Sequence, residues 1–109
     1  MAGGEGTRMA DMMLGILITK HENLGHIAGL VTAARKAGHR VRIFVTDEGV
    51  KFTRDPEFVD LLRDGGVEIA VCDYMCEVLG IGERSEGITY GSQYDNAGMM
   101  HQCARVLVF

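Results

Sequence analysis

Residues 67–80 read VEIAVCDYMCEVLG, and this stretch decides the fold because its pattern changes halfway along. The first five residues are mostly apolar and include β-branched side chains, which predicts a short strand. Met75 and Leu79 then recur at helical spacing, and Gly80 is placed to end a brief helix. Cys72 therefore lies where a strand passes directly into a helix.

Three earlier segments show the same succession of strand and helix. The apolar run 13–19 is short and continuous, which suits a strand covered on both faces. Residues 24–34 carry apolar side chains at helical spacing, and Asn23 is placed to cap this helix. Residues 40–46 alternate as a strand does, with Phe44 facing the opposite side from its β-branched neighbours.

The later segments repeat the succession with shorter elements. A polar turn is expected at 47–49, followed by a short helix in which Asp55 offers a capping carboxylate and Pro56 a preset φ angle. Further patterns predict a small strand at 88–90, a helix from Ser92 to Ala104 and a terminal strand at 105–109.

Strands that alternate with helices are joined by crossover connections, which make the strands parallel and place helices on both faces of the sheet. We therefore predict an α/β fold, a three-layer α/β/α sandwich with a mainly parallel sheet of about five strands. This single domain is expected to span residues 13–109. Residues 1–12 are Gly-rich and polar, without an apolar pattern, and are expected to form a flexible N-terminal leader.

Composition excludes several classes of function. The 109 residues hold 11 Lys plus Arg against 15 Asp plus Glu, a formal charge of −4, without a basic run or Trp, so a nucleic-acid partner is not expected. No apolar stretch is long enough to span a membrane, so we expect a soluble, cytoplasmic protein.

Three cysteines are too few for a secreted disulfide framework, and the spacing of Cys and His disfavours zinc. No phosphate-cradling glycine motif is present, and no cofactor is expected.

The expected chemistry lies at the carboxyl ends of the strands, where parallel sheets form their ligand crevice. Three loops lie there in the predicted fold, at 20–23, 46–49 and 72–76. A thiol at Cys72 would meet the positive end of the following helix, which favours thiolate, whereas Asp73 disfavours it. Cys76 lies four residues later, on the same face if the segment is helical, and is predicted to receive or resolve a modification on Cys72.

A family resemblance is carried by several of these segments. In residues 67–81 a strand delivers Cys72, and Gly80 and Ile81 follow eight and nine positions later, which resembles the cysteine segment of the DsrE/DsrF-like family. Residues 38–50, GHRVRIFVTDEGV, resemble the family's second strand and "DGV" loop with one Glu inserted, and 104–109 resemble its terminal strand. The resemblance covers about residues 13–109.

That resemblance implies a compact three-layer fold, homo- or hetero-oligomers and a cytoplasmic role in sulfur relay, as in the TusD-like subunits. Such proteins hold a persulfide on a cysteine and pass it to a partner, and Cys72 falls at the carrier position. The partners implied are a sulfur donor protein and a sulfur acceptor protein, the activity is that of a possible sulfurtransferase, and the mechanism needs neither metal nor organic cofactor.

Two other interpretations remain open. In the first, the protein is a non-catalytic module of the same fold that binds a small molecule or a partner, with its cysteines merely packed, as Cys103 is expected to be among its apolar neighbours. In the second, His21 follows the first strand as the phosphocarrier histidine does in mannose-type phosphotransferase components. Accessibility of the thiols in the native protein distinguishes the binding module from the sulfur carrier. A phosphohistidine assay tests the role of His21.

Overall fold

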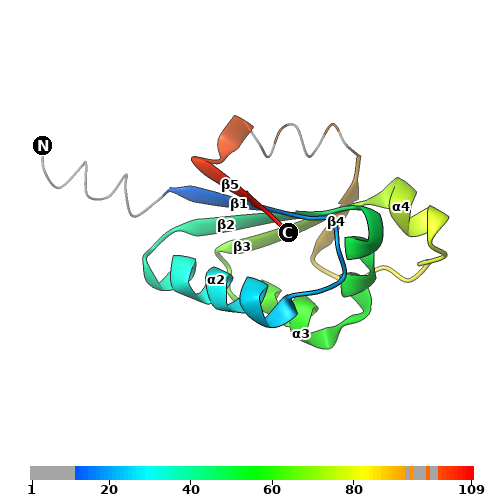
Figure 1. Ribbon diagram of the computed structural model, residues 1–109, viewed down its shortest axis with the longest axis horizontal. Helices are drawn as coiled ribbons and strands as arrows, with labels where there is room; N and C mark the ends of the chain where they lie inside the picture. Colours follow the sequence, from blue (N-terminus) through cyan, green and yellow to red (C-terminus); the bar gives the residue numbers. More distant parts are fainter. Residues whose placement is uncertain (1–11, 93, 95–97, 99–100) are drawn as a thin grey trace, which may run out of the picture.

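The computed structural model describes residues 12–92, 94, 98 and 101–109 and contains a five-stranded sheet in which all neighbouring strands are parallel (Figure 1). The strands are β1 (Met13–Ile18), β2 (Arg40–Val45), β3 (Val67–Cys72), β4 (Ile88–Gly91) and β5 (Arg105–Val108). Their order across the sheet is β4-β3-β2-β1-β5. The predicted α/β class and parallel sheet are therefore confirmed, whereas the predicted leader, residues 1–12, lies outside the described residues except for Met12.

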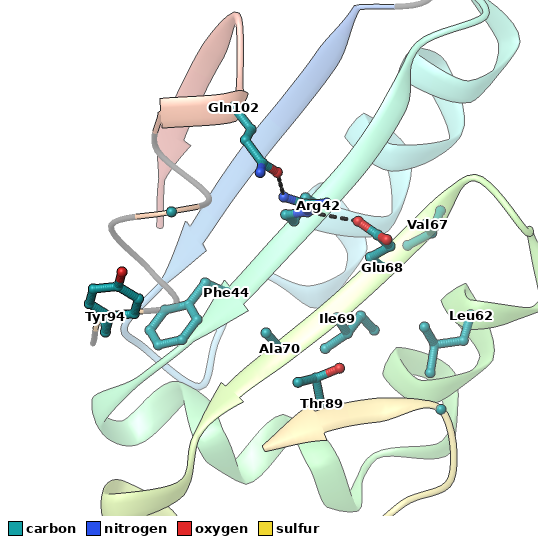
Figure 2. Close-up of a pocket in the computed structure, with 12 residues that line it drawn as sticks. Arg42, Phe44, Leu62, Val67, Glu68, Ile69, Ala70, Thr89, Tyr94 and Gln102 are labelled. Atoms are coloured by element: carbon teal, nitrogen blue, oxygen red, sulfur yellow. Dashed lines mark hydrogen bonds and ion pairs between the residues drawn. The ribbon is translucent and has the colours of Figure 1, made fainter. Parts of the chain in front are cut away.

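Helical connections cover the sheet unequally. They are α2 (Leu24–Lys36), the 3₁₀ helix η1 (Asp47–Arg54), α3 (Pro56–Val59), the 3₁₀ helix η2 (Asp60–Arg63) and α4 (Asp73–Val78). Crossover connections between parallel strands are right-handed. The connections from β1 to β2 and from β2 to β3 run in the same direction across the sheet, so they lie on the same face, where Figure 1 shows α2 and α3. The return to β5 crosses the other face, where Gln102 lies over Arg42 (Figure 2).

The sheet separates two apolar clusters. The large cluster lies under α2 and α3 and contains Val41, Ile43 and Val45 of β2. The small cluster lies on the other face and is built on buried Phe44 and Cys72, with partly buried neighbours from β1, β3, α4 and Cys103 packed against it. The alternation predicted for residues 40–46 is confirmed, because Phe44 does face away from its β-branched neighbours.

Two residues predicted to cap helices precede those helices as expected, but neither forms a side-chain capping hydrogen bond. Asn23 does precede α2, but its backbone is left-handed, with φ at 67°, and its side chain makes no capping hydrogen bond. Asp55 does precede α3, with Pro56 as the first helical residue, but its carboxylate is bound by the ring Nε2 of His21 at 2.9 Å instead. In the second case a contact between distant segments displaces the local cap.

The segment after β2 is more helical than its sequence predicts. The sequence predicts a polar turn at 47–49, but the structure forms the eight-residue η1, which buries Val50 and Phe52 in the large cluster. Gly49 permits this path, since a Cβ there would lie 2.9 Å from the carbonyl oxygen of Ile18. The helix expected after Asp55 divides into α3 and η2, and much of the helix expected from Ser92 to Ala104 lies outside the described residues. Within the described part of the chain, no helix has both the length and the apolar character needed to cross a bilayer.

Candidate functional site

Cys72 is the last residue of β3 and directly precedes α4. In the parallel register it lies opposite Gly91 of β4, and the two-residue period of the strand directs Ala70 and Cys72 to the face of the small cluster. Only 3% of the residue is exposed. The position at the junction of strand and helix agrees with the sequence.

A hollow of about 720 Å³ opens where β2, β3 and β4 end, and Cys72 lines it. We call it the Cys72 hollow; its other lining residues are Thr46, Asp47, Asp73, Tyr74, Met75, Tyr90, Gly91 and Ser92. Cys72, a nearly buried residue, therefore borders an open space at the carboxyl edge of the sheet, which is where ligands bind in parallel folds.

Two of the three predicted loops meet in this hollow, and one does not. Residues from 46–49 and 72–76 line it, but none from 20–23 does. The third wall comes from the end of β4, residues 90–92, which sequence analysis missed. No local pattern signals this wall, because it depends on the pairing of β4 with β3, which brings the carboxyl end of β4 beside Cys72.

The negative charge of Asp73, which follows Cys72 directly in the chain, is neutralised by a cation from the loop before β4. Arg84 donates from Nη2 to Oδ1 of Asp73 at 2.6 Å, and its guanidinium lies 4.4 Å from the centre of the Tyr90 ring. The hydroxyl of Tyr90 in turn accepts a hydrogen bond from the backbone N–H of Ser85 at 2.8 Å. One wall of the hollow is therefore held by a chain of polar contacts that includes an ion pair.

Cys76 packs away from Cys72. Its side chain belongs to the large cluster, is 2% exposed and does not line the hollow. The expected shared helix face is not formed, because Cys72 keeps extended backbone angles and α4 begins one residue later. Burial raises the pKa of the Cys76 thiol, and the charges of Asp73 and Cys72 add to this effect.

We predict that Cys76 resists alkylation in the folded protein. Because its pKa lies above the ordinary 9.0, the thiol stays protonated at neutral pH, and burial also blocks the reagent. Iodoacetamide labelling followed by peptide mass spectrometry is expected to show Cys76 modified only after denaturation or well above pH 9.0. Equal labelling of Cys76 in the native and urea-unfolded protein at pH 7 would contradict this prediction.

Neither Cys103 nor His21 lines the hollow, and each has other partners. The sulfur of Cys103 covers Gly15 of β1, where a Cβ would approach it to 2.8 Å, and burial raises the pKa of this thiol. His21 is bound to Asp55 and meets the edge of the Phe52 ring, with 4.7 Å between ring centres. Among residues 12–92, 94, 98 and 101–109, no group of three or more His, Cys, Asp or Glu is arranged to hold a metal ion.

A second pocket, of about 480 Å³, lies over the opposite half of the same sheet face (Figure 2). Arg42 crosses its floor, donating to Glu68 at 2.7 Å and to the side-chain oxygen of Gln102. The aromatic rings of Phe44 and Tyr94 form one end. This pocket combines apolar walls with the ion pair of Arg42 and Glu68.

Comparison with known proteins identifies the family at the level of the whole domain. The family model described as the DsrE/DsrF-like family matches residues 12–109. No curated protein gives a significant match to the chain. The matched region contains all five strands and the Cys72 hollow, and it agrees with the resemblance seen in the cysteine segment. The chain therefore belongs to the DsrE/DsrF-like family.

Proposed function

We propose that this protein is a sulfur carrier that holds a persulfide on Cys72 and transfers the outer sulfur to a partner protein. Membership of the DsrE/DsrF-like family favours sulfur relay in general terms. The observation that carries the specific proposal is that Cys72, at the end of β3, borders an open hollow of about 720 Å³. The other two thiols do not line that space.

The proposed reaction is an exchange between sulfur atoms without net oxidation. The Cys72 thiolate attacks the outer sulfur of a donor persulfide, the S–S bond of the donor breaks, and the donor leaves as a thiolate. In the second step an acceptor thiolate attacks the outer sulfur now on Cys72. Cys72 then leaves as a thiolate, so neither metal nor organic cofactor takes part.

The carrier would work in a reducing compartment, because all three cysteines are free and free thiols persist in the cytoplasm. We propose donor and acceptor proteins as its partners, and self-association as a homo-oligomer. Exposed apolar side chains at the sheet edge, Leu107 and Val108 of β5, favour such a contact. The role that the sequence assigns to Cys76, resolving a modification on Cys72, stays a prediction.

The proposal is tested by loading and unloading the native protein. Incubation with a small persulfide donor is expected to add the mass of one sulfur atom to the intact chain, located on Cys72 by peptide mapping. Cyanide, which removes an outer sulfur as thiocyanate, is expected to restore the original mass. A chain that gains no sulfur, or gains it only on Cys103 or Cys76, would refute the assignment.

Removal of Arg84 is predicted to slow loading while leaving the fold intact. Arg84→Gln leaves the Asp73 carboxylate without its Arg84 partner in the lining of the hollow, and this negative charge repels an anionic persulfide donor that approaches Cys72. We expect loading to slow by about three- to tenfold, and unfolding free energy to fall by about 1 kcal/mol or less, since the pair is exposed. Mass spectrometry over time and urea unfolding measure the two effects.

Two control variants isolate the role of the charge at Arg84. Arg84→Lys keeps a cation and is expected to recover part of the loading rate. Arg63→Gln removes an equally short exposed ion pair, with Asp60 at 2.6 Å, on η2. Slowing of the same size in Arg63→Gln would show that Arg84 has no particular effect on Cys72.

A second candidate function, a small-molecule binding module, is favoured by the pocket in Figure 2. Its volume of about 480 Å³ and its Arg42–Glu68 ion pair beside apolar side chains suit a small polar ligand. In this alternative the cysteines are structural. Thiols that all resist alkylation until the native protein unfolds would favour the module, whereas rapid labelling of Cys72 alone favours the carrier.

A further inference from the structure

An exposed apolar face lies beside the Cys72 hollow. Tyr74 and Val78 are 70% and 55% exposed. They are four residues apart on α4, so their side chains are neighbours on the helix surface. Tyr74 also lines the hollow, and Figure 1 shows α4 projecting beyond the ends of the strands. A molecule that reaches Cys72 through the hollow therefore meets Tyr74 in its lining, and Val78 lies next to Tyr74 on α4.

The mouth of the hollow is also acidic. Its lining includes Asp47 and Asp73 but no Lys, Arg or His among the described residues. Arg84 neutralises Asp73, whereas neither Asp47 nor the exposed Glu77, which lies between Tyr74 and Val78 on α4, forms an ion pair with a described residue. Within the described part of the chain, two carboxylates therefore remain without an ion-pair partner near the apolar pair.

We propose that the exposed face of α4 and these carboxylates form a docking surface for a protein segment whose cysteine is flanked by basic residues and by one apolar side chain. The inference rests on the proposed carrier function and names the class of acceptor. The apolar side chain would pack on Tyr74 and Val78, and the basic residues would lie against Asp47 and Glu77. The acceptor thiolate would then attack the outer sulfur on Cys72, and Cys72 would leave as the thiolate.

The same charges would protect the loaded sulfur from the wrong acceptor. Glutathione, a small thiol with net negative charge, would remove the sulfur non-specifically if it entered the hollow. Uncompensated carboxylates at the mouth repel such an acidic thiol and attract a basic segment, which gives discrimination by repulsion as well as by attraction. The surface thus selects the acceptor by charge before any sulfur moves.

Three synthetic peptides test the proposal on the loaded protein. Each has one cysteine: the first has flanking Lys and a Leu, the second has Glu in place of Lys, and the third has Lys but Ser in place of Leu. Transfer rates are followed by intact mass, and each is divided by the rate of that peptide with a neutral small disulfide, which corrects for thiol reactivity. At low salt the first peptide is expected to exceed the second by about three- to tenfold, and this ratio should approach one near about 1 M salt.

Variants connect each effect to a residue. Asp47→Asn and Glu77→Gln are each expected to reduce the preference for Lys over Glu, and Tyr74→Ala to reduce the preference for Leu over Ser. Glu57→Gln removes an exposed carboxylate from α3 and is the matched control, with no expected change. Equal corrected rates for the Lys and Glu peptides at low salt, or a preference unchanged in the double variant at Asp47 and Glu77, would overturn the docking surface.

A separate arm distinguishes failure of docking from failure of the carrier function. Unloaded protein is treated with a cationic or an anionic methanethiosulfonate, which forms a mixed disulfide with Cys72 and releases methanesulfinate. Faster reaction of the cationic reagent, corrected against a free thiol, supports the acidic mouth even if a persulfide donor adds no sulfur. If sulfur loads but neither reagents nor peptides are discriminated by charge, the carrier proposal stands and the docking surface is refuted.

Discussion

Cys72→Ser abolishes the gain of one sulfur atom when the protein is incubated with a persulfide donor. This result is expected because Cys72 is the one thiol that borders the hollow, whereas Cys76 lies in the large cluster and Cys103 covers Gly15. A serine hydroxyl is not ionised at neutral pH and cannot replace the thiolate that attacks the donor. The loss should be complete by intact mass, not partial.

The matched variants Cys76→Ser and Cys103→Ser are expected to load sulfur as the native protein does. Because the side chain at residue 72 is nearly buried, a hydroxyl there loses water contacts, and we expect a cost of about 1–2 kcal/mol in unfolding free energy. Cys72→Ala avoids the buried hydroxyl and serves as a second variant. Sulfur gain by either folded Cys72 variant would end the carrier assignment.

The largest loss of stability is expected from Phe58→Ala. Phe58 has no exposed surface, and its ring stacks on that of Phe52 with 5.1 Å between centres. Truncation removes a full aromatic side chain from the large cluster and leaves a cavity, which costs about 3–5 kcal/mol. Since small domains are stable by about 5–15 kcal/mol in total, urea unfolding should show a strongly lowered midpoint.

Tyr74→Ala is the matched aromatic truncation on the surface. Its side chain is mostly exposed, so the same change in chemistry should alter unfolding free energy by about 0.5 kcal/mol or less. Phe58→Leu keeps most of the apolar volume and should fall between the two. A midpoint for Phe58→Ala equal to that of Tyr74→Ala would mean that the large cluster is not the main source of stability.

Local patterns were sufficient to predict most of the fold. Alternation in 40–46 and the switch of period in 67–80 depend on side chains a few residues apart, and the resulting strands and α2 lie where expected. The exceptions depend on distant partners. Asp55 binds His21 rather than the end of its own helix, and the path of η1 requires Gly49 to fit against the carbonyl of Ile18.

The candidate site was predictable in part for the same reason. The position of Cys72 at a strand end is local information, but the wall formed by residues 90–92 depends on the order of strands, which periodicity does not encode. The pairing of Asp73 with Arg84 joins residues eleven apart across an irregular loop. The separation of Cys72 from Cys76 depends on where α4 begins. Because α4 begins at Asp73, Cys72 is outside the helix and its side chain does not share a helix face with that of Cys76.

The proposed reactive cysteine and most of the apolar core lie on opposite faces of the sheet. The sulfur at Cys72 belongs to the small cluster, while the large cluster under α2 and α3 contains most of the buried side chains. A lineage could therefore lose the thiol and keep a well-formed scaffold. Expression level, solubility and melting temperature would not reveal that such a descendant is inert, and only an assay of sulfur itself would do so.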